Sequence, residues 1–363
     1  MADVLVVGGG LAGGAAACLL ARQGRDVLLL EREHGPHHKV CGEFLSVEAA
    51  AHLRQLGVDP ASLGGVPIQR IRLVSGTVEA EAPLPFGAWG LSRHVLDEAL
   101  LRETIAAGAR VERGVRVLEL GGCVARTSEG DREGEYLLLA SGKLPLRERG
   151  TASTGRAEAG FVGFKMHYRL APAAMHRLAG TIMLFLFGGG YAGLQMVEGG
   201  RANLCLVVRR SRLAQSGGDW TGLRARLDEI AALREMLADA EPLFDRPVTI
   251  ANLNYGMAPA RTANSRVLRL GDQWAMTASL TGDGMAIALR SAFVAAQSVM
   301  AGEDARRYDC RLAAEVRGQV RRAMAFQNML DHPVLRQAGC HAARSFPALL
   351  TMAARATRLR EWR

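Results

Sequence analysis

Lysine is almost missing from this chain of 363 residues: it occurs only at positions 39, 143 and 165, so arginine supplies the rest of the 45 basic residues. The formal net charge is +9, and a basic protein can bind nucleic acid or an anionic surface. The excess of positive charge is concentrated in residues 306–363, which contain 12 arginines and only four acidic residues. Neither interleaved aromatic residues nor a known nucleic-acid-binding motif accompanies these arginines. We therefore expect no nucleic-acid partner, and a non-enzymatic nucleic-acid-binding protein is the remote alternative.

Closely spaced cysteines are missing as well. The six cysteines lie far apart, with no C-x-x-C and no cysteine–histidine spacing typical of zinc. The uncharged stretch from Val4 to Ala21 contains five glycines and follows Asp3 instead of a basic segment, so it fits neither a signal peptide nor a transmembrane helix. We expect no metal site and a reducing, cytoplasmic location.

The composition, 49% hydrophobic and 22% charged, is that of a globular protein, and the length favours two interlocking lobes. Short strands separated by glycine clusters between Phe161 and Val208 predict an antiparallel sheet. Helical patterns cover residues 93–107, 220–240 and 284–300, and they continue over 304–359 with breaks at Pro333 and Pro347. Because no internal repeat is present, the domains are expected to interleave along the chain.

The N-terminus has the pattern of a dinucleotide-binding turn. Gly8, Gly10 and Gly13 form G-x-G-x-x-G between an apolar strand and an Ala/Leu-rich helix, and Glu31 ends the next strand. The first glycine makes the turn, the second lets a pyrophosphate approach the helix N-terminus, and the third allows helix and strand to pack closely. Glu31 would accept hydrogen bonds from a ribose diol. These residues predict binding of an adenine dinucleotide.

A second G-x-G-x-x-G, at Gly188, Gly190 and Gly193, could indicate a separate nicotinamide-dinucleotide domain. However, Gly199 and Gly200 follow too soon for a helix, and the intervening residues alternate as a strand does. We interpret this segment as a glycine-rich hairpin in the sheet lobe.

The distal half of the chain contains two further glycine motifs that bear on the cofactor. The strand-like run 267–270 leads into Gly271-Asp272, and Thr281-Gly-Asp-Gly-Met285 then opens an apolar helix. This arrangement resembles the second flavin fingerprint of the FAD-dependent oxidoreductases that include para-hydroxybenzoate hydroxylase and, more closely, geranylgeranyl reductase. In that family a helix N-terminus faces the flavin, where its dipole stabilises negative charge on the reduced ring.

Further segments carry the same resemblance, which extends over residues 1–300. R-x-x-L-D at Arg93–Asp97 is similar to the family helix whose arginine approaches the cofactor phosphates, and Ala140–Lys143 stands where the family has A-D-G or A-T-G. The resemblance implies an α/β fold in which a Rossmann-like FAD-binding domain is interleaved with an antiparallel-sheet substrate domain, followed by C-terminal helices. We assign residues 1–70, 91–150 and 258–305 to the first, 71–90 and 151–257 to the second, and 306–363 to the helices. The expected cofactor-binding residues are Gly8, Gly10, Leu11, Ala12, Gly13, Glu31, Arg32, Cys41, Gly42, Arg93, Val117, Ser141, Gly271, Asp272, Gly282, Asp283, Gly284 and Met285.

The resemblance also nominates two catalytic residues. Cys41, in Lys39-Val-Cys-Gly-Glu43, resembles the C-G motif of the geranylgeranyl reductase branch, which lies beside the isoalloxazine. Tyr191 stands where the reductases carry Y-x-W-x-F-P along the substrate channel, although this chain keeps only the tyrosine. Gln195, Lys165 and His167 are further candidate lining residues, and Ser279 replaces the proline of the family's P-x-T-G-x-G loop.

The expected activity is that of an FAD-dependent oxidoreductase acting on a small hydrophobic organic substrate, by hydride transfer to a double bond. A flavin-dependent monooxygenase of an aromatic or polyketide-like substrate is the alternative, and the W-x-W-x-I-P signature of the tryptophan halogenases is absent. NADH or NADPH would be a transient electron donor. Residues 346–360 mix apolar residues and arginines at helical spacing, which predicts a terminal helix with solvated arginines and, as a further hypothesis, peripheral membrane contact. A monomer is favoured.

Overall fold

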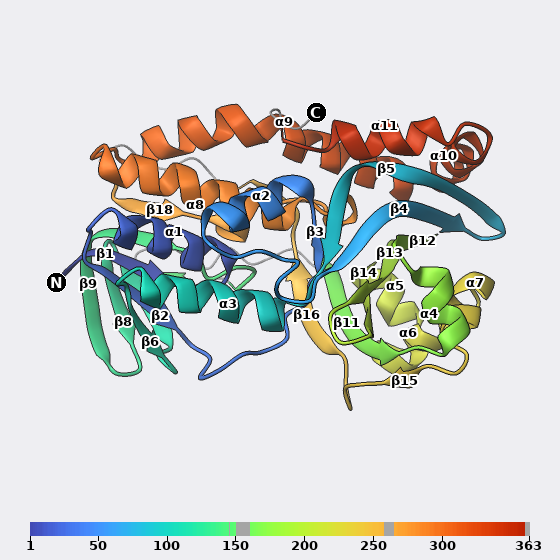
Figure 1. Cartoon of the computed structure of the whole chain (residues 1–363), viewed down its shortest axis with the longest axis horizontal. Coiled ribbons are helices and arrows are strands. Elements are labelled where there is room, and N and C mark those ends of the chain that lie inside the picture. Colours follow the sequence, from blue (N-terminus) through green and yellow to red (C-terminus); the bar gives the residue numbers. More distant parts are fainter. Residues whose placement is uncertain (145, 150–159, 258–264, 360–363) are drawn as a thin grey trace.

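The computed structural model describes residues 1–144, 146–149, 160–257 and 265–359, and it contains two β-sheets flanked by helices (Figure 1). The first sheet has the order β10-β7-β8-β9-β1-β2-β6, and β18 also pairs with β9. Its strands are β1 (Ala2–Val7), β2 (Val27–Glu31), β6 (Arg110–Arg113), β7 (Val117–Gly121), β8 (Val124–Thr127), β9 (Gly130–Leu139), β10 (Arg147–Glu148) and β18 (Val267–Arg269). The pairs β1–β2, β1–β9, β2–β6 and β9–β18 are parallel, as in a Rossmann-like domain, whereas β8 pairs antiparallel with β7 and β9.

Both faces of this first sheet are covered, one by helices and the other in part by strands β7 and β8, because its central strands are apolar on both faces. Val4, Leu5 and Val6 are all fully buried, so each face of β1 needs a covering layer. The helices α1 (Leu11–Arg22), α3 (Arg93–Ala106) and α8 (Gly284–Met300) pack together on one side, and α2 (Val47–Gln55) packs on α8. Small side chains on α1 allow this close contact, since Ala15, Ala16 and Ala17 are fully buried.

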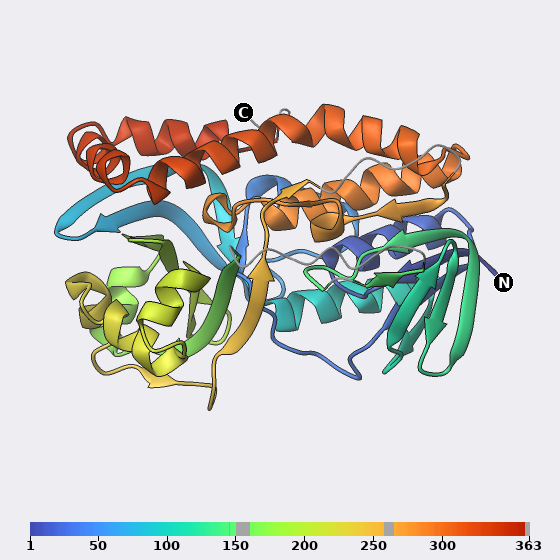
Figure 2. The same ribbon diagram turned by 180° about the vertical axis from the view of Figure 1, so that it is seen from behind.

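The second sheet has the order β15-β11-β14-β13-β12-β4-β5-β3, with β16 beside β11. Its strands are β3 (Phe44–Leu45), β4 (Val66–Ser75), β5 (Val78–Gly90), β11 (Phe161–Arg169), β12 (Thr181–Phe187), β13 (Gly190–Val197), β14 (Arg201–Arg209), β15 (Glu241–Pro242) and β16 (Val248–Leu253). All of its pairs are antiparallel except that of β12 with β4. Four short helices lie beside it (Figure 2): α4 (Pro172–Leu178), α5 (Arg210–Gln215), α6 (Trp220–Leu227) and α7 (Ala231–Met236).

The second G-x-G-x-x-G is a hairpin, as its sequence predicted. β12 and β13 pair antiparallel from Phe187 opposite Gly190, and the turn between them contains Gly189 in the left-handed region, with φ +81°. No helix follows, because β13 runs on to Val197.

Two boundaries differ from those expected. The second sheet takes β3 and residues 66–70 of β4 from a stretch that we assigned to the first domain. The two residues of β3 are too few to show an alternating pattern, and Pro67 near the start of β4 disguises that strand, because proline is uncommon inside strands. The helical pattern over 220–240 is split into α6 and α7 around Asp228–Ile230.

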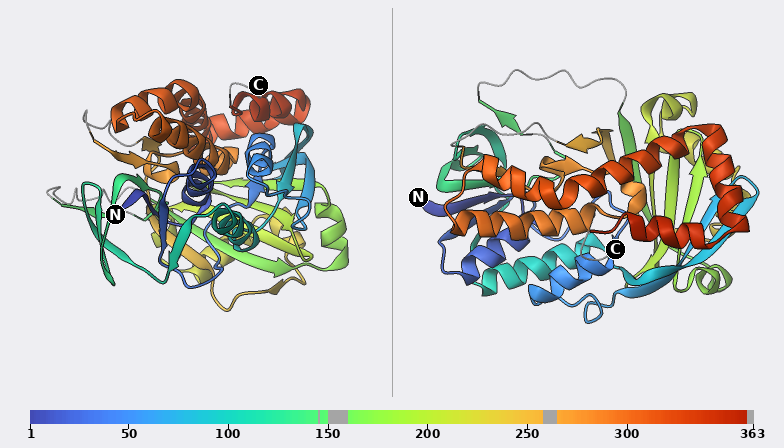
Figure 3. Two further views of the ribbon diagram at one scale, coloured as in Figure 1. Left: turned by 60° about the vertical axis from the view of Figure 1, so that its left-hand side comes forward. Right: turned by 90° about the horizontal axis from the view of Figure 1, so that it is seen from above.

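The C-terminal helices form a layer over both sheets (Figure 3). α9 (Ala305–Asp331) lies alongside α8, and α10 (Pro333–Ser345) and α11 (Ala348–Ala356) turn back over β5. The chain breaks at Pro333 and Pro347, as predicted, since proline fits only the first turn of a helix. Between these layers lie η1 (Gly271–Gln273), η2 (Ser279–Thr281) and a small pair of strands, β17 (Gly256–Met257) and β19 (Ala275–Met276). Among the described residues, no helix has the length and apolar character needed to cross a membrane.

One buried histidine makes the fold sensitive to acid. His52 of α2 is 7% exposed, its ring lies 4.8 Å from that of Phe293, and neither ring nitrogen has a hydrogen-bond partner among the described residues. Burial, with Arg290 nearby, lowers the pKa of His52 to about 4. The unfolded chain therefore binds a proton near pH 6.5 that the folded protein does not bind, and the contribution of His52 to stability falls as the pH drops from about 6.5 towards 4.

We predict that His52→Leu weakens this pH dependence, which for one group has a slope of up to roughly 1.4 kcal/mol per pH unit. Urea unfolding of the wild type and variant at pH 7.5 and pH 5 measures it. His176→Leu, at an exposed position on α4, is the control and keeps the wild-type slope. Equal slopes for His52→Leu and the wild type would contradict the assignment.

Candidate active site

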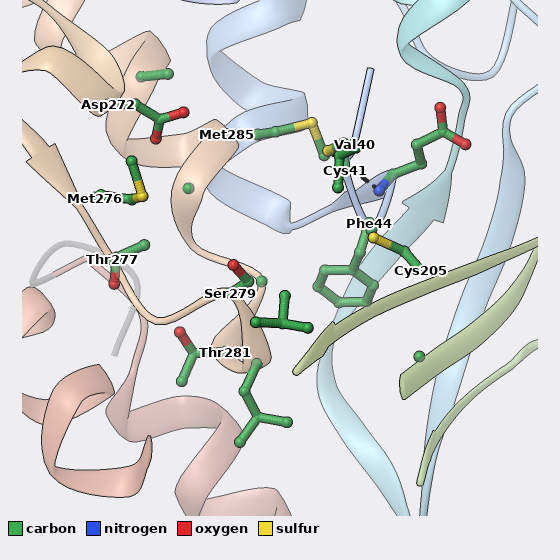
Figure 4. Close-up of a pocket in the computed structure, with 18 of the residues that line it drawn as sticks. Val40, Cys41, Phe44, Cys205, Asp272, Met276, Thr277, Ser279, Thr281 and Met285 are labelled. Carbon is green, nitrogen blue, oxygen red and sulfur yellow. Dashed lines mark hydrogen bonds between the residues drawn. The ribbon is translucent and has the colours of Figure 1, made fainter. Parts of the chain in front are cut away.

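A cavity of about 1220 Å³ lies between the two sheets and beneath the C-terminal helices. It is larger than the ~300–1,000 Å³ typical of small-molecule sites. One end is formed by the glycine turn after β1, and the middle by the loop at Val40–Phe44 and the segment before α8 (Figure 4). The other end lies among apolar side chains. The cavity therefore has room for a large cofactor and for a second molecule beside it.

The glycine turn has the close contacts that its motif requires. Gly8 has φ +107°, and a Cβ there would lie 2.5 Å from the Ala140 carbonyl oxygen. A Cβ on Gly13 would lie 1.9 Å from the Gly8 carbonyl oxygen, so this glycine lets α1 pack on the turn. α1 has no side-chain cap at Gly10 and no acidic residue in its first turn. Its N-terminal N–H groups can therefore bind an anion.

Glu31 is held at the end of β2 with its carboxylate at the cavity wall. Its Oε2 accepts a hydrogen bond from the Gly9 N–H at 2.7 Å, and its Oε1 accepts one from the Glu33 N–H at 3.0 Å. Each carboxylate oxygen can accept a second hydrogen bond, so the side chain can still bind a diol.

Two cations lie over the turn. A Cβ on Gly10 would be 3.3 Å from Arg93 Nη2 and 3.5 Å from Lys39 Nζ. Both cations bind Asp97, Lys39 through Oδ2 at 2.8 Å and Arg93 through Oδ1 at 2.6 Å and Oδ2 at 2.9 Å. Burial opposes the charge of Asp97, but Arg93 and Lys39 hold the pKa of its carboxyl below the ordinary value. One carboxylate against two cations leaves a net positive charge beside the anion-binding turn.

Arg93 was expected beside this turn, but neither Lys39 nor Asp97 was predicted to have a role there. Both stand inside motifs that we quoted, Lys39 ahead of Cys41 and Asp97 at the end of R-x-x-L-D. For Asp97 the available signal was its i,i+4 spacing from Arg93, because such positions share a helix face. The contact with Lys39 depends on tertiary structure.

We predict that substitutions of Gly10 and Gly13 differ in their effects, the first on cofactor binding and the second on stability. Gly10→Ala is compatible with the backbone, since φ is −77°, but its methyl group enters the space beneath Arg93 and Lys39. We expect a folded protein that binds FAD at least about tenfold more weakly, measured by fluorescence titration. Gly13→Ala collides with backbone and should lower the melting temperature even without FAD. Equal losses of stability in both variants would contradict this assignment.

The segment before α8 forms the opposite wall of the cavity. Gly271 and Gly282 both adopt left-handed conformations, with φ +56° and +70°, and a Cβ on Gly282 would lie 2.7 Å from the Phe44 ring. Thr277 lines the same wall, and its buried Oγ1 has no hydrogen-bond partner among the described residues. Figure 4 shows this segment facing Cys41 and Phe44. The orphaned hydroxyl and the N-terminus of α8 fit a polar-edged ring such as a flavin.

Most of the expected cofactor-binding residues line this one cavity, although their contacts with FAD stay predictions. Those at the cavity wall are Gly8, Gly10, Leu11, Ala12, Glu31, Arg32, Cys41, Gly42, Arg93, Val117, Ser141, Gly271, Asp272, Gly282, Gly284 and Met285. Gly13 supports the turn from behind.

Asp283 is the other predicted residue that does not line the cavity. It is fully buried and binds Arg358, a residue that follows α11 and is itself only 1% exposed. Burial, partly offset by Arg358, raises the pKa of Asp283 to about 7. This corrects two expectations: Asp283 is a structural anchor of the segment before α8, and the tail arginines are not all solvated. Arg360, the last arginine of the quoted helical pattern, lies outside the described residues.

Side chains of the second sheet clamp the loop that carries Cys41. Asn203 Nδ2 donates to the carbonyl oxygens of Cys41, at 3.1 Å, and Gly42, at 2.9 Å. Gln195 Nε2 donates to the Glu43 carbonyl oxygen at 2.8 Å, and Glu43 has a left-handed backbone with φ +58°. Because a non-glycine residue in this region is strained, these bonds hold a conformation that the loop alone would disfavour.

The Glu43 side chain is the centre of a buried polar cluster. Its Oε1 accepts hydrogen bonds from the Arg93 N–H, at 2.9 Å, and from Lys165, and its Oε2 lies 2.8 Å from His167 Nε2. All three side chains of Glu43, Lys165 and His167 are 0% exposed. Burial acts to raise the pKa of Glu43, but the hydrogen bond from His167 and the charge of Lys165 outweigh it and lower the pKa.

This cluster changes the roles of two predicted lining residues. Lys165 and His167 do not reach the cavity wall, whereas Gln195 and Tyr191 do. His38, Glu43 and His167 also place potential metal ligands within 4.8 Å of one another. However, Lys165 Nζ already supplies the cation for Glu43 and lies 3.5 Å from His38 Nδ1, so a metal ion would meet a positive charge. Burial and Lys165 lower the pKa of His38 to about 3.

We predict that the pair of Glu43 and Lys165 is strongly coupled. Lys165→Met leaves a buried carboxylate without its cation, and breaking a buried pair in this way costs about 3–5 kcal/mol of unfolding free energy. The double variant Glu43→Gln/Lys165→Met should be more stable than either single variant, as urea unfolding would show. Arg169→Met, which removes an exposed ion pair at the end of the same strand, should change stability by less than about 1 kcal/mol. If the losses of unfolding free energy in the two single variants add up in the double variant, Glu43 and Lys165 are not coupled.

Beyond the loop with Cys41 the cavity becomes apolar. Its wall there includes residues of β4, β5, β12, α9 and α11, among them Ile71, Leu73, Phe86, Ile182, Met329 and Leu350. Tyr191 lies where the two parts meet, next to Cys205 and Tyr255, and Tyr255 Oη is 3.2 Å from Ser279 Oγ. Burial, followed by the neighbouring Tyr255, raises the pKa of Tyr191 well above its ordinary value. At neutral pH the phenol of Tyr191 therefore keeps its proton and does not act as a base.

Comparison with known proteins agrees with this site. Residues 1–120 match a family of FAD binding domains. The chain is 30% identical over 318 residues to digeranylgeranylglycerophospholipid reductase 1 of Methanopyrus kandleri, covering 79% of this chain and 77% of that protein. It is 29% identical over 343 residues to menaquinone reductase of Mycobacterium tuberculosis, covering 86% and 80%. The structure of the flavin-dependent brominase Bmp2 superposes with a TM-score of 0.78 over 100% of this chain and 96% of that one, at 17% identity, which shows a shared fold.

Together, the glycine turn, the matched domain and the relatives define an FAD-dependent oxidoreductase. The chain belongs to the family of the geranylgeranyl reductase and para-hydroxybenzoate hydroxylase type, as its motifs predicted.

Proposed function

We propose that this enzyme reduces a double bond in a substrate with a long apolar portion. The observation that carries the proposal is the continuation of the cavity past the cofactor cradle into an apolar channel beneath α9 and α11. A channel of this kind suits a hydrocarbon chain, whose burial contributes about 0.8 kcal/mol per CH₂ group. Two relatives are named as reductases of menaquinone and of a digeranylgeranyl phospholipid, which supports the same class of reaction.

Bound FAD, once reduced, would supply a hydride to the double bond. The residues of this chain then have three tasks. Glu31, Arg93 and the N-terminus of α1 would hold the dinucleotide, and the apolar channel would align the substrate and exclude water. The remaining task is to hold a proton near the reacting carbon, and Tyr191 is the candidate, because it lines the cavity and its hydroxyl lies near Ser279 of the segment before α8.

We also propose that NADH or NADPH reduces the flavin by transient binding. The second glycine motif is a hairpin, so within the described residues a single turn is built for a dinucleotide, and the cofactor would occupy it. A nicotinamide donor would therefore enter the large cavity only briefly and leave before the substrate binds.

A monooxygenase on the same fold differs in its need for oxygen. The experiment uses the holoenzyme reduced with dithionite under nitrogen and then supplied with menaquinone carrying an isoprenoid side chain, or with a geranylgeranyl lipid. We expect reoxidation of the flavin without oxygen and, after any quinol has been reoxidised in air, a product heavier by two hydrogen atoms in its isoprenoid chain. A product formed only in air, with oxygen incorporated, would establish the monooxygenase instead.

Tyr191→Phe tests the proton donor in the same assay. We expect turnover to fall by about 100-fold, while reduction of the flavin by dithionite and FAD affinity remain unchanged. Tyr168→Phe is the control, since Tyr168 is equally buried but lies in the core of the second sheet, away from the cavity. Unchanged turnover in Tyr191→Phe would remove this residue from the proposed reaction.

A further inference from the structure

The exposed apolar side chains of this protein gather on α10, on α11 and at the turn between these helices. Val334 and Phe346 are both 66% exposed and Met352 is 64% exposed, with Leu335 at 50% and Leu349 at 43%. Elsewhere in the described part of the chain, large exposed apolar residues occur singly, as Ile105 on α3 and Leu118 on β7 do. A grouped apolar surface of this kind marks an interaction site, whereas scattered ones are ordinary.

The same surface is basic. Residues 332–358 contain four arginines and no aspartate or glutamate. Arg344 and Arg355 are exposed on α10 and α11, the same helices that carry the exposed apolar residues. We call the surface formed by Val334, Leu335, Arg344, Phe346, Leu349, Met352 and Arg355 the docking face. Apolar residues flanked by arginine, without acidic residues, have the composition of helices that lie in the headgroup region of an anionic membrane.

The docking face also leads to the cavity. Leu349 and Met352 are exposed to solvent and at the same time line the cavity wall, so the apolar part of the cavity reaches the protein surface at α11. Figure 3 shows α10 and α11 at the far end of the helical layer, away from the N-terminal sheet. A molecule dissolved in a membrane could pass into the cavity here without crossing water.

We propose that the docking face binds peripherally to the surface of an anionic lipid membrane. A second copy of this chain fits the face less well, since a two-fold contact would bring Arg344 and Arg355 of both copies together with no acidic residue of 332–358 to pair with them. The proposal depends on the composition of this surface and not on the reaction proposed above, although it would bring an apolar substrate to its channel.

Flotation of the FAD-loaded enzyme with lipid vesicles tests the proposal. We expect binding to vesicles of phosphatidylcholine mixed with phosphatidylglycerol, much weaker binding to phosphatidylcholine alone, and release at high salt. Val334→Ser/Phe346→Ser and Arg344→Gln/Arg355→Gln should each weaken binding at least about tenfold. None of these four residues lines the cavity, so FAD affinity and turnover of a detergent-solubilised substrate should not change.

Matched controls are available on other surfaces. Ile105→Ser/Leu118→Ser removes two exposed apolar side chains elsewhere, and Arg102→Gln/Arg147→Gln removes two exposed arginines elsewhere, and both variants should bind vesicles as the wild type does. Failure of the wild type to bind anionic vesicles, or equal binding by docking-face and control variants, overturns the proposal. A dimer in light scattering that Val334→Ser/Phe346→Ser converts to a monomer, without vesicle binding, assigns the face to a second copy. If turnover of the solubilised substrate is normal, the proposed reaction stands, and either of these results concerns the docking face alone.

Discussion

The buried carboxylate of Glu43 joins the two halves of the molecule. It accepts the backbone N–H of Arg93 at the start of α3 on the cofactor side, and it binds Lys165 and His167 of β11 on the other side. The same residue has a left-handed backbone, so the chain turns sharply just after Cys41. Since a buried carboxylate is stable only with its cation and hydrogen bonds in place, the relative position of the two sheets and the shape of the Cys41 loop depend on one another.

A second buried ion pair has the same function on the opposite wall. Arg358 reaches from the end of α11 to Asp283 and to the Thr281 carbonyl oxygen, which ties the C-terminal helices to the segment that begins α8. The cavity is thus enclosed by two walls, each fixed by a buried charge at a distance from the cofactor turn. The apolar channel exists because α9, α10 and α11 are held over β4 and β5 in this way, leaving space that their own side chains do not fill.

Local sequence signals predicted much of this architecture, because glycine spacing, helix stops and alternating strands are properties of short segments. The turn at Gly8–Gly13, the helix from Gly284 and the breaks at Pro333 and Pro347 are of this kind. The pairings of Glu43 with Lys165 and of Asp283 with Arg358 join residues 122 and 75 positions apart, and no periodicity connects them. For the same reason Lys165 and His167 were expected at the cavity wall, whereas in the fold both bind the buried carboxylate of Glu43.

We propose above all that the cofactor site continues into a channel for an apolar chain. Ligands that share one head group but carry one to four isoprene units would test it most directly, by titration into the oxidised holoenzyme with the flavin absorbance as the signal. We expect the dissociation constant to fall with each added unit until the channel is filled, because each buried CH₂ contributes about 0.8 kcal/mol. A dissociation constant independent of chain length would contradict it.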